Sequence, residues 1–139
     1  MSPITVKTFQ NVFPVFKNEQ ETLLNRLLAT AVSKQFPRGA TLYFEGDPCP
    51  GIGFLLSGEI RVFKISASGR EITLYEIFPG ETCILNASCL LSHQPYPAHA
   101  AGTAEGTMLF IPDHLFLQYM AESDAMRTFI FSLFSRRFY

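Results

Sequence analysis

Four side chains that can bind a metal or react with an oxidant lie near one another in the sequence. Cys83, Cys89, His93 and His99 form a C-x5-C-x3-H-x5-H series. Thiolate and imidazole groups are common ligands of zinc, and either can bind haem iron. The spacing differs from the close pairs of zinc fingers and ribbons, and cysteine is also a common small core residue. Two interpretations stay open: a haem, metal or thiol-redox sensor, or core packing of both cysteines.

Cys83 has the more distinctive position of the two cysteines. We expect it in the first turn of a short helix over residues 82–91, where backbone amides lower a thiol pKa and favour redox or nitrosation chemistry. On one helix, Cys83 and Cys89 would be about 9 Å apart, which is too far for a disulfide. Cys49, which has a proline on each side, is interpreted as an exposed turn residue. The odd total of three cysteines argues against a disulfide-stapled secreted domain.

No catalytic constellation accompanies these residues. The sequence has no Gly-x-Ser-x-Gly elbow, no Walker-type lysine loop and no His-Glu-x-x-His motif. His114 follows Pro112 and Asp113, so we expect it at a solvated helix start. The protein is therefore predicted not to be an enzyme.

The composition limits the class of protein further. A chain of 139 residues is of one-domain size. With 11 Lys and Arg against 12 Asp and Glu, it lacks the positive field that attracts nucleic acid. Hydrophobic residues make up 47% and charged residues 17%, which favours a folded core. No apolar run approaches the ~20 residues of a membrane span, and MSPITVKTFQ lacks a secretory signal, so we expect a cytoplasmic protein without membrane contact.

Three zones of sequence pattern must position these side chains. Residues 1–35 are expected to be helical, with a helix that is capped by Asn18 and ends near Ser33. Residues 36–112 change to short β-type runs between glycines and prolines, with a hairpin turn at 66–69, which is typical of a barrel or roll. Residues 113–139 return to helical spacing, first over 113–120 and then after Asp124.

The last of these helices carries a strong apolar stripe and no stop signal. Neither Gly nor Pro ends it before Tyr139, so we expect the natural chain to continue beyond this residue. The stripe serves either dimerisation or packing on the protein's own roll, and different faces of the helix can serve both. Its members are Met126, Phe129, Ile130, Leu133, Phe134 and Phe138.

Three stretches together resemble the effector domain of the Crp/Fnr family of bacterial transcription regulators. They are FPRGATLYFEGDPCPGIGFLLSGEIRVFK, in which Gly39, Gly46 and Gly58 fall at the family's spacing, then SGREITLYEIFPGE, then AGTAEGTMLFIPDHLF. The resemblance covers most of residues 36 to 139. It implies a mainly β fold with flanking helices, namely the cyclic-nucleotide-binding-like (cupin-like) double-stranded β-roll, with an N-terminal helix and the start of a C-terminal dimerisation helix.

The same resemblance implies partners. A Crp/Fnr regulator is a homodimer joined along a long helix, here beginning near Asp124, and it passes the binding of a small-molecule effector to a helix-turn-helix domain. We expect no such domain within these residues, so DNA is a partner only through a C-terminal domain that is absent. The same roll also regulates kinases, channels and transporters. Arg136 and Arg137 on the amphipathic last helix resemble the dimer-helix entry of transcription regulators and favour that output.

Nucleotide-binding relatives hold the phosphate with two elements. A Gly-Glu pair opens a short helix whose amides face the phosphate, and an Arg followed by Ser or Thr neutralises its charge. Gly80 and Glu81 match the first element, but Pro97 and Ala98 stand where the arginine and its neighbour are expected. Glu81 then lacks its usual cation. We therefore expect an effector other than cyclic AMP or cyclic GMP, and a genuine cyclic-nucleotide site is the alternative.

The pocket itself is expected to persist, with a mainly apolar wall and few polar groups. No metal or other cofactor is expected, with haem as an alternative. A cupin-type enzyme is disfavoured because the chain has no His-x-His pair for its metal. The residues assigned to the effector pocket are Leu74, Tyr75, Gly80, Glu81, Thr82, Cys83, Ile84, Tyr96, Pro97, Ala98 and His99.

Overall fold

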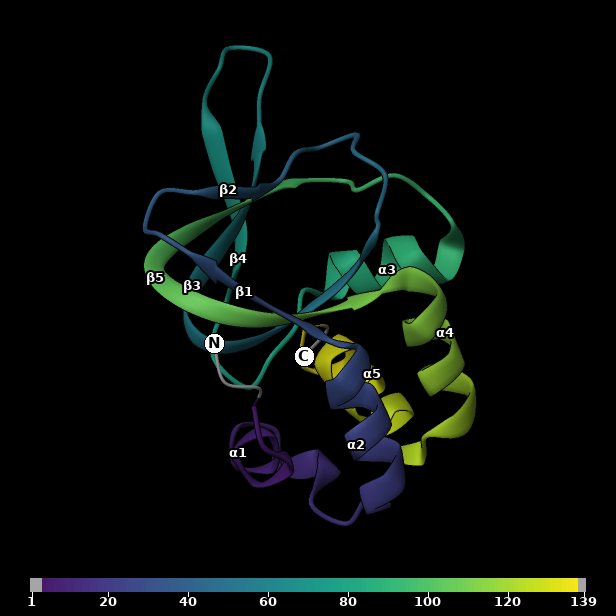
Figure 1. Ribbon diagram of the computed structural model, residues 1–139. Helices are drawn as coiled ribbons and strands as arrows, with labels where there is room; N and C mark the ends of the chain where they lie inside the picture. The colour runs from purple at the N-terminus through teal and green to yellow at the C-terminus, as the bar shows by residue number, and fades with distance from the viewer. Residues whose placement is uncertain (1–3, 138–139) are drawn as a thin grey trace.

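Helices from both ends of the chain pack together below an antiparallel β-roll (Figure 1). The computed structural model describes residues 4–137. The helices and strands, in chain order, are α1 Val6–Val12, η1 Pro14–Phe16, α2 Glu21–Thr30, β1 Val32–Phe36, β2 Thr41–Tyr43, β3 Gly51–Ile65, β4 Glu71–Ile77, α3 Ile84–Ser92, β5 His99–Pro112, α4 Asp113–Glu122 and α5 Asp124–Arg137. This arrangement confirms the mainly β fold with flanking helices.

Two long strands form the spine of the roll. β3 has 15 residues and β5 has 14, and they pair antiparallel from Gly51 opposite Pro112 to Phe63 opposite His99. The strand order is β1-β5-β3-β4, and β2 pairs with β5 as well. The predicted turn at 66–69 joins β3 to β4, with Gly69 at a φ of 84°. The projecting β3–β4 hairpin is visible at the top of Figure 1.

The N-terminal segment differs from the sequence prediction. α2 begins at Glu21 after Gln20, rather than at a cap formed by Asn18, and it ends at Thr30. Residues 32–36 form β1 and pair with β5 over residues 106–110, although residues up to 35 were predicted to be helical. Pairing with a neighbouring strand overrides local helical spacing here. The sequence analysis also missed α1, in which the Thr5 hydroxyl caps the helix by accepting from the Thr8 amide.

The helices cover one end of the roll through an aromatic core. The ring of Phe129 on α5 lies 5.6 Å from the rings of Phe13 and Phe54 and 5.8 Å from that of Phe16, between centroids. Phe9 stacks on Phe13 at 4.9 Å. All five rings are buried. The N-terminal segment therefore holds α5 against the underside of β3.

The apolar stripe of α5 is buried in this core. Its members Met126, Phe129, Ile130 and Leu133 are buried, and Phe134 is half-buried. The prediction that they form a dimer surface was wrong for the buried four, because they contact the protein's own roll and N-terminal helices. Packing on the roll, the alternative, is confirmed for them. Phe138 lies outside the described residues.

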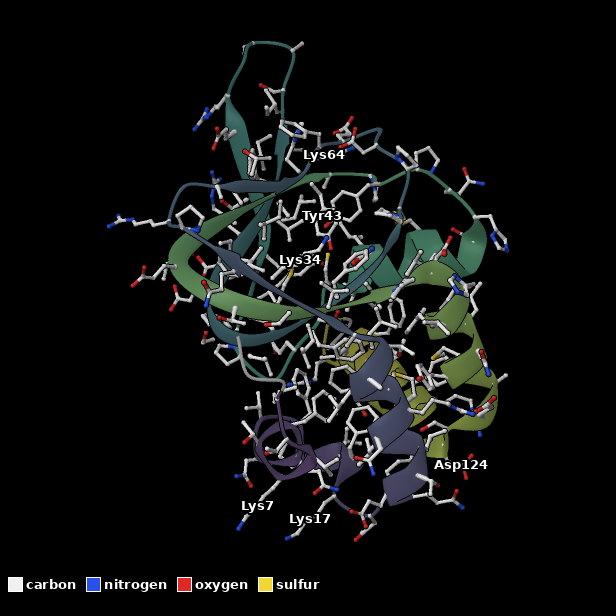
Figure 2. All side chains as sticks on the ribbon, viewed as in Figure 1. Lys7, Lys17, Lys34, Tyr43, Lys64 and Asp124 are labelled. Atoms are coloured by element: carbon white, nitrogen blue, oxygen red, sulfur yellow. A yellow bond between two sulfur atoms is a disulfide. The ribbon has the colours of Figure 1, made fainter. Side chains whose placement is uncertain are left out.

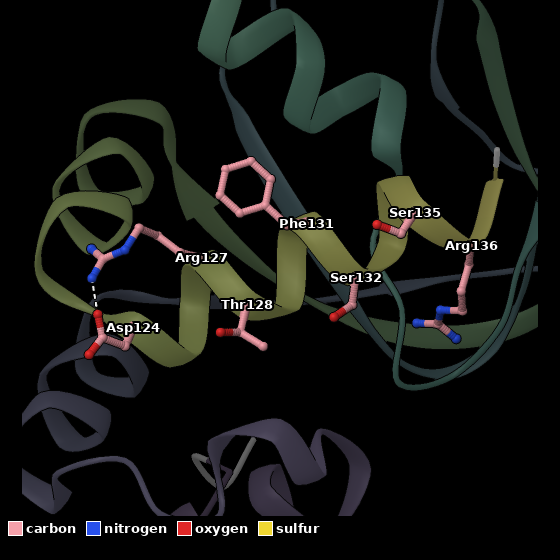
Figure 3. Close-up of a pocket in the computed structure, with 7 residues that line it drawn as sticks. All are labelled: Asp124, Arg127, Thr128, Phe131, Ser132, Ser135 and Arg136. Atoms are coloured by element: carbon pink, nitrogen blue, oxygen red, sulfur yellow. Dashed lines mark hydrogen bonds and ion pairs between the residues drawn. The ribbon is translucent and has the colours of Figure 1, made fainter. Parts of the chain in front are cut away.

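A different face of α5 reaches solvent. Phe131 is 59% exposed and lies between Thr128 and Ser135 on that face, as Figure 3 shows. Asp124 and Arg127 form an ion pair at the start of the helix. Among residues 4–137, no helix is long and apolar enough to cross a membrane.

Candidate functional site

The interior of the roll holds a few polar side chains within an apolar shell. The Cys83 sulfur lies 2.8 Å from the Tyr75 hydroxyl and 2.9 Å from the Tyr96 hydroxyl. The Tyr96 ring packs on Tyr43 at 4.8 Å between centroids, and Tyr43 donates to the Asn86 Oδ1 atom. Figure 2 shows Tyr43 within the outline of the roll. We call Tyr43, Tyr75, Cys83, Asn86 and Tyr96 the tyrosine–cysteine cluster.

Burial favours the uncharged form of Tyr43, Cys83 and Tyr96 in this cluster. Cys83 precedes α3 as its N-cap residue and is only 4% exposed. Burial raises the pKa of the Cys83 thiol, and this outweighs the hydrogen bonds from the tyrosines and nearby amides that lower it. Burial likewise raises the pKa values of Tyr43 and Tyr96. The predicted activation of Cys83 by a helix terminus was therefore wrong, because desolvation of a thiolate is the larger effect.

Alkaline pH should destabilise the protein through these groups. A buried acid with a raised pKa adds stability below its unfolded-state pKa, and this stability is lost as the pH rises past that value. We expect the thermal midpoint to hold between about pH 7 and 8.5 and to fall above about pH 9. The free energy of unfolding should decrease there by up to about 1.4 kcal/mol per pH unit for Cys83. Calorimetric scans across pH 7–10 test this. Cys83→Ala should give a flatter profile between about pH 9 and 10, and an unchanged slope would contradict the assignment.

Backbone amides of the Gly80–Glu81 loop are hydrogen-bonded to other groups of the protein. Gly80 has a φ of 89° and donates its amide to the Leu55 carbonyl at 3.0 Å. The Glu81 amide donates to the Phe78 carbonyl, and the Glu81 carboxylate accepts from the Phe78 amide at 3.0 Å. At the start of α3, the Leu85 amide donates to the Tyr75 hydroxyl at 3.4 Å. These three amides of the loop and of the start of α3 therefore already have protein acceptors.

Glu81 forms an ion pair with an arginine, which the sequence did not predict. Arg136 of α5 lies 3.6 Å from the Glu81 carboxylate, between Nη1 and Oε2. Its side chain is largely exposed and lines a groove of about 340 Å³ with Val12, Phe78 and Glu81. Figure 3 shows Arg136 at the end of the exposed face of α5. This arginine approaches Glu81 from outside the roll, so it does not supply the missing charge inside.

Small side chains at the start of β5 and just before it are buried inside the roll. Ala98 and Ala100 are buried, and Pro97 before them is exposed. His99 turns away from the tyrosine–cysteine cluster, because its ring stacks on Phe63 at 5.4 Å and accepts from the Glu45 amide. No charged side chain is buried in the part of the chain that the structure describes. Pro97, at the position expected for the arginine, is therefore exposed, and the buried residue beside it is the small Ala98.

The predicted pocket residues separate into two groups. Tyr75, Cys83, Tyr96 and Ala98 come together inside the roll. The prediction was wrong for Leu74 and Pro97, which are exposed, for His99, which packs on Phe63, and for Ile84, which packs against the aromatic core. Thr82 is buried, and its hydroxyl donates to the Gly53 carbonyl. Tyr43 and Asn86 were missed, because nothing in the spacing links them to Cys83.

The cysteine and histidine series is not one site. Cys89 forms a disulfide with Cys49, with the two Cα atoms 6.6 Å apart, and Cys83 is a free buried thiol. The interpretation of Cys49 as an unpaired turn residue was wrong. His93 ends α3 with a φ of 58° and is exposed. Within residues 4–137, no group of three or more His, Cys, Asp or Glu side chains is arranged to hold a metal ion.

Comparisons with known proteins agree with this fold. Residues 33–123 match the family model described as the cyclic nucleotide-binding domain. A stretch of 41 residues is 39% identical to the global nitrogen regulator of Synechococcus elongatus and covers 30% of this chain and 18% of that protein. A 47-residue stretch is 36% identical to the Synechocystis regulator of the same name, covering 34% of this chain and 21% of that protein. The match thus spans about a fifth of these relatives.

Solved structures with this fold cover nearly the whole chain. A Crp/Fnr-family transcriptional regulator of Eubacterium rectale superposes with a TM-score of 0.79 at 23% identity, over 92% of this chain and 59% of that one. The sensor domain of the regulator DNR of Pseudomonas aeruginosa gives 0.77 at 18% identity, over 94% and 86%. The Thermus thermophilus catabolite activator protein gives 0.74 at 22% identity, over 90% and 58%.

The family model covers well over half of the chain, and the β-roll is the fold that these solved structures share. This chain therefore belongs to the cyclic nucleotide-binding domain family.

Proposed function

We propose that this domain is the ligand-sensing module of a Crp/Fnr-type transcription regulator and that its effector is not a cyclic nucleotide. The observation that carries the proposal is the neutral interior of the roll. Pro97 and Ala98 stand where the arginine and its neighbour are expected, and Ala98 is buried in one cluster with Cys83 and Tyr96. A phosphate diester buried there would lose its hydration without a charged partner.

The same groups indicate the chemistry of an effector that enters the roll. It must replace the hydrogen bonds among Tyr75, Cys83 and Tyr96, so its polar atoms must match two hydroxyls and a thiol. The remaining wall is apolar and includes Leu55, Val62 and Met108. An uncharged small molecule with a few hydrogen-bonding atoms fits this surface better than an anion does.

The Gly80–Glu81 loop offers a path from the interior to α5. It contacts β3 through Leu55 and α5 through the Glu81–Arg136 ion pair. A ligand that moves Tyr75 or the start of α3 would move this loop and bias the position of α5. In the proposed regulator, α5 continues toward a DNA-binding domain and pairs with a second copy through its exposed face around Phe131.

Calorimetry with cyclic nucleotides tests the proposal directly. We expect no saturable heat with cyclic AMP or cyclic GMP, which corresponds to dissociation constants weaker than about 1 mM, because no arginine is buried among the residues whose side chains the structure describes. A cyclic-nucleotide-binding catabolite activator domain, titrated under the same conditions, serves as the positive control. Stoichiometric binding of either nucleotide at micromolar concentration would contradict the proposed effector class.

A further inference from the structure

The disulfide between Cys49 and Cys89 lies at the boundary of the two cores. Cys49 is in the β2–β3 loop and packs against both hydrophobic clusters, and Cys89 is on α3 in the cluster inside the roll. We infer that this bridge is a reversible thiol–disulfide site that exchanges with small thiols and controls how firmly α3 is held to the roll. This inference does not depend on the identity of the effector.

Solvent can reach the bridge. Both cysteines line a surface groove of about 480 Å³, together with residues of the loop before β5 and of the start of α4, among them His93 and Asp113. Cys49 is half-exposed, whereas Cys89 is only 3% exposed. A small thiol entering the groove therefore meets the Cys49 sulfur first.

The protein around the bridge does not need it to keep its shape. The loop carrying Cys49 is held by other bonds: the Gly46 amide donates to the Tyr96 carbonyl at 2.8 Å, and the Tyr96 amide donates to the Asp47 carbonyl at 2.9 Å. The Asp113 amide donates to the Pro50 carbonyl at 3.0 Å. These contacts keep the two sulfurs near each other after reduction, so the bridge can form again.

In the reduced protein, the buried Cys89 thiol has a hydrogen-bond acceptor close by. The Cys89 sulfur lies 3.1 Å from the Asn86 carbonyl oxygen, one helical turn earlier. In the disulfide this sulfur has no proton to donate, but a Cys89 thiol can donate to that oxygen without moving. Reduction therefore leaves no buried polar group unsatisfied at Cys89.

The exchange requires two equivalents of a low-molecular-weight thiol, such as glutathione. A first thiolate attacks the Cys49 sulfur, the Cys49–Cys89 bond breaks, and Cys89 leaves as a thiolate that takes a proton from solvent. A second thiolate attacks the mixed disulfide on Cys49 and releases a Cys49 thiolate, which is protonated in turn. The protein gains two electrons and two protons, and two thiols are oxidised to one small disulfide.

Cys83, the third cysteine, does not take part in this thiol–disulfide exchange. Cys83 is buried and lies between the Tyr75 and Tyr96 hydroxyls, away from the groove. It is therefore neither an attacking thiol nor an alternative partner for Cys89. Cys83→Ala consequently serves as the matched control for Cys49→Ala.

Loss of the disulfide should weaken the attachment of α3 to the rest of the roll. The covalent link joins this helix to the β2–β3 loop, and the same helix carries Asn86, which accepts from Tyr43 and donates to the Gly51 carbonyl at 2.8 Å. Without the link, α3 is held by hydrogen bonds, which include these and the one from the Leu85 amide to Tyr75, and by apolar contacts. We expect backbone amides of residues 84–92 to exchange with deuterium about tenfold faster in the reduced protein.

The test equilibrates the full chain with mixtures of reduced and oxidised glutathione. The exchange is stopped with acid, the protein is denatured, and free thiols are labelled with N-ethylmaleimide. The intact mass then counts the labelled thiols: one in the oxidised protein and three in the reduced protein. We expect one reversible two-electron transition. The circular dichroism spectra of the fully oxidised and fully reduced protein should be the same. The hydrogen-exchange rate of α3 should change with the redox state. Cys83→Ala should titrate in the same way, and Cys49→Ala should show the fast α3 exchange at every glutathione ratio.

Three results would overturn the inference. A bridge that stays closed in the folded chain at every glutathione ratio is purely structural. Equal α3 exchange in the oxidised and reduced wild-type protein would show that the bridge does not hold the helix. Loss of the transition in Cys83→Ala would mean that a different pair of thiols reacts. Each readout is made on the wild-type chain or on the Cys83 control, so a poorly folded Cys49 variant leaves the inference testable.

Discussion

Replacing Phe129 with alanine should lower the free energy of unfolding by about 3–5 kcal/mol. Phe129 is 5% exposed, and its ring contacts the rings of Phe13, Phe16 and Phe54. These contacts join α5 to the N-terminal segment and to β3, so the truncation leaves a cavity where three elements meet. Chemical denaturation of the variant and the wild-type protein measures the difference directly.

Phe131 provides a matched control two residues along the same helix. It is 59% exposed, so Phe131→Ala should change the free energy of unfolding by less than about 0.5 kcal/mol. Sedimentation across a range of protein concentrations then separates stability from association. If Phe129→Ala kept its stability but dissociated a dimer, the stripe would be an interface and not a core. If Phe131→Ala alone weakened self-association, the exposed face would be the dimer surface.

The fold was predictable because its signals are local and repeated. Glycines between short β-type runs indicate hairpins, and the turn at Gly69 falls where the sequence places it. The prediction was wrong for residues 32–35 of β1, because they become part of a strand only by pairing with β5, a contact that no local pattern contains. α1 was missed even though Thr5 is a good cap, with Phe9 and Phe13 at helical spacing after it.

The candidate site was predictable only in part, because its geometry depends on contacts between distant segments. The prediction that the phosphate-binding arginine is missing needed only Pro97 and Ala98. The disulfide could not, because Cys49 and Cys89 are 40 residues apart and the pairing needs the β2–β3 loop to lie on α3. The raised pKa of Cys83 depends on burial between two tyrosines, which a helix-terminus argument does not include.

Gly58→Ala should destabilise the spine of the roll for two separate reasons, backbone conformation and crowding. Gly58 has a φ of 89°, which costs an alanine about 1–2 kcal/mol. A Cβ atom there would also lie 2.6 Å from the Glu105 carbonyl oxygen and 2.7 Å from the Gly106 Cα atom. Both are backbone atoms of β5 and cannot rotate away, so overpacking adds about 1–3 kcal/mol. Together, a loss of about 2–5 kcal/mol is expected in chemical denaturation.

Gly69→Ala separates the two causes, because it shares the backbone conformation and lacks the crowding. Gly69 has a φ of 84°, and a Cβ there would meet nothing within 4 Å. Its alanine variant should therefore lose only the conformational part, about 1–2 kcal/mol. Equal losses at both positions would mean that β3 and β5 can move apart at Gly58. A larger loss at Gly58 would mean that close contact between these strands holds β3, and with it Leu55, in place against the Gly80–Glu81 loop.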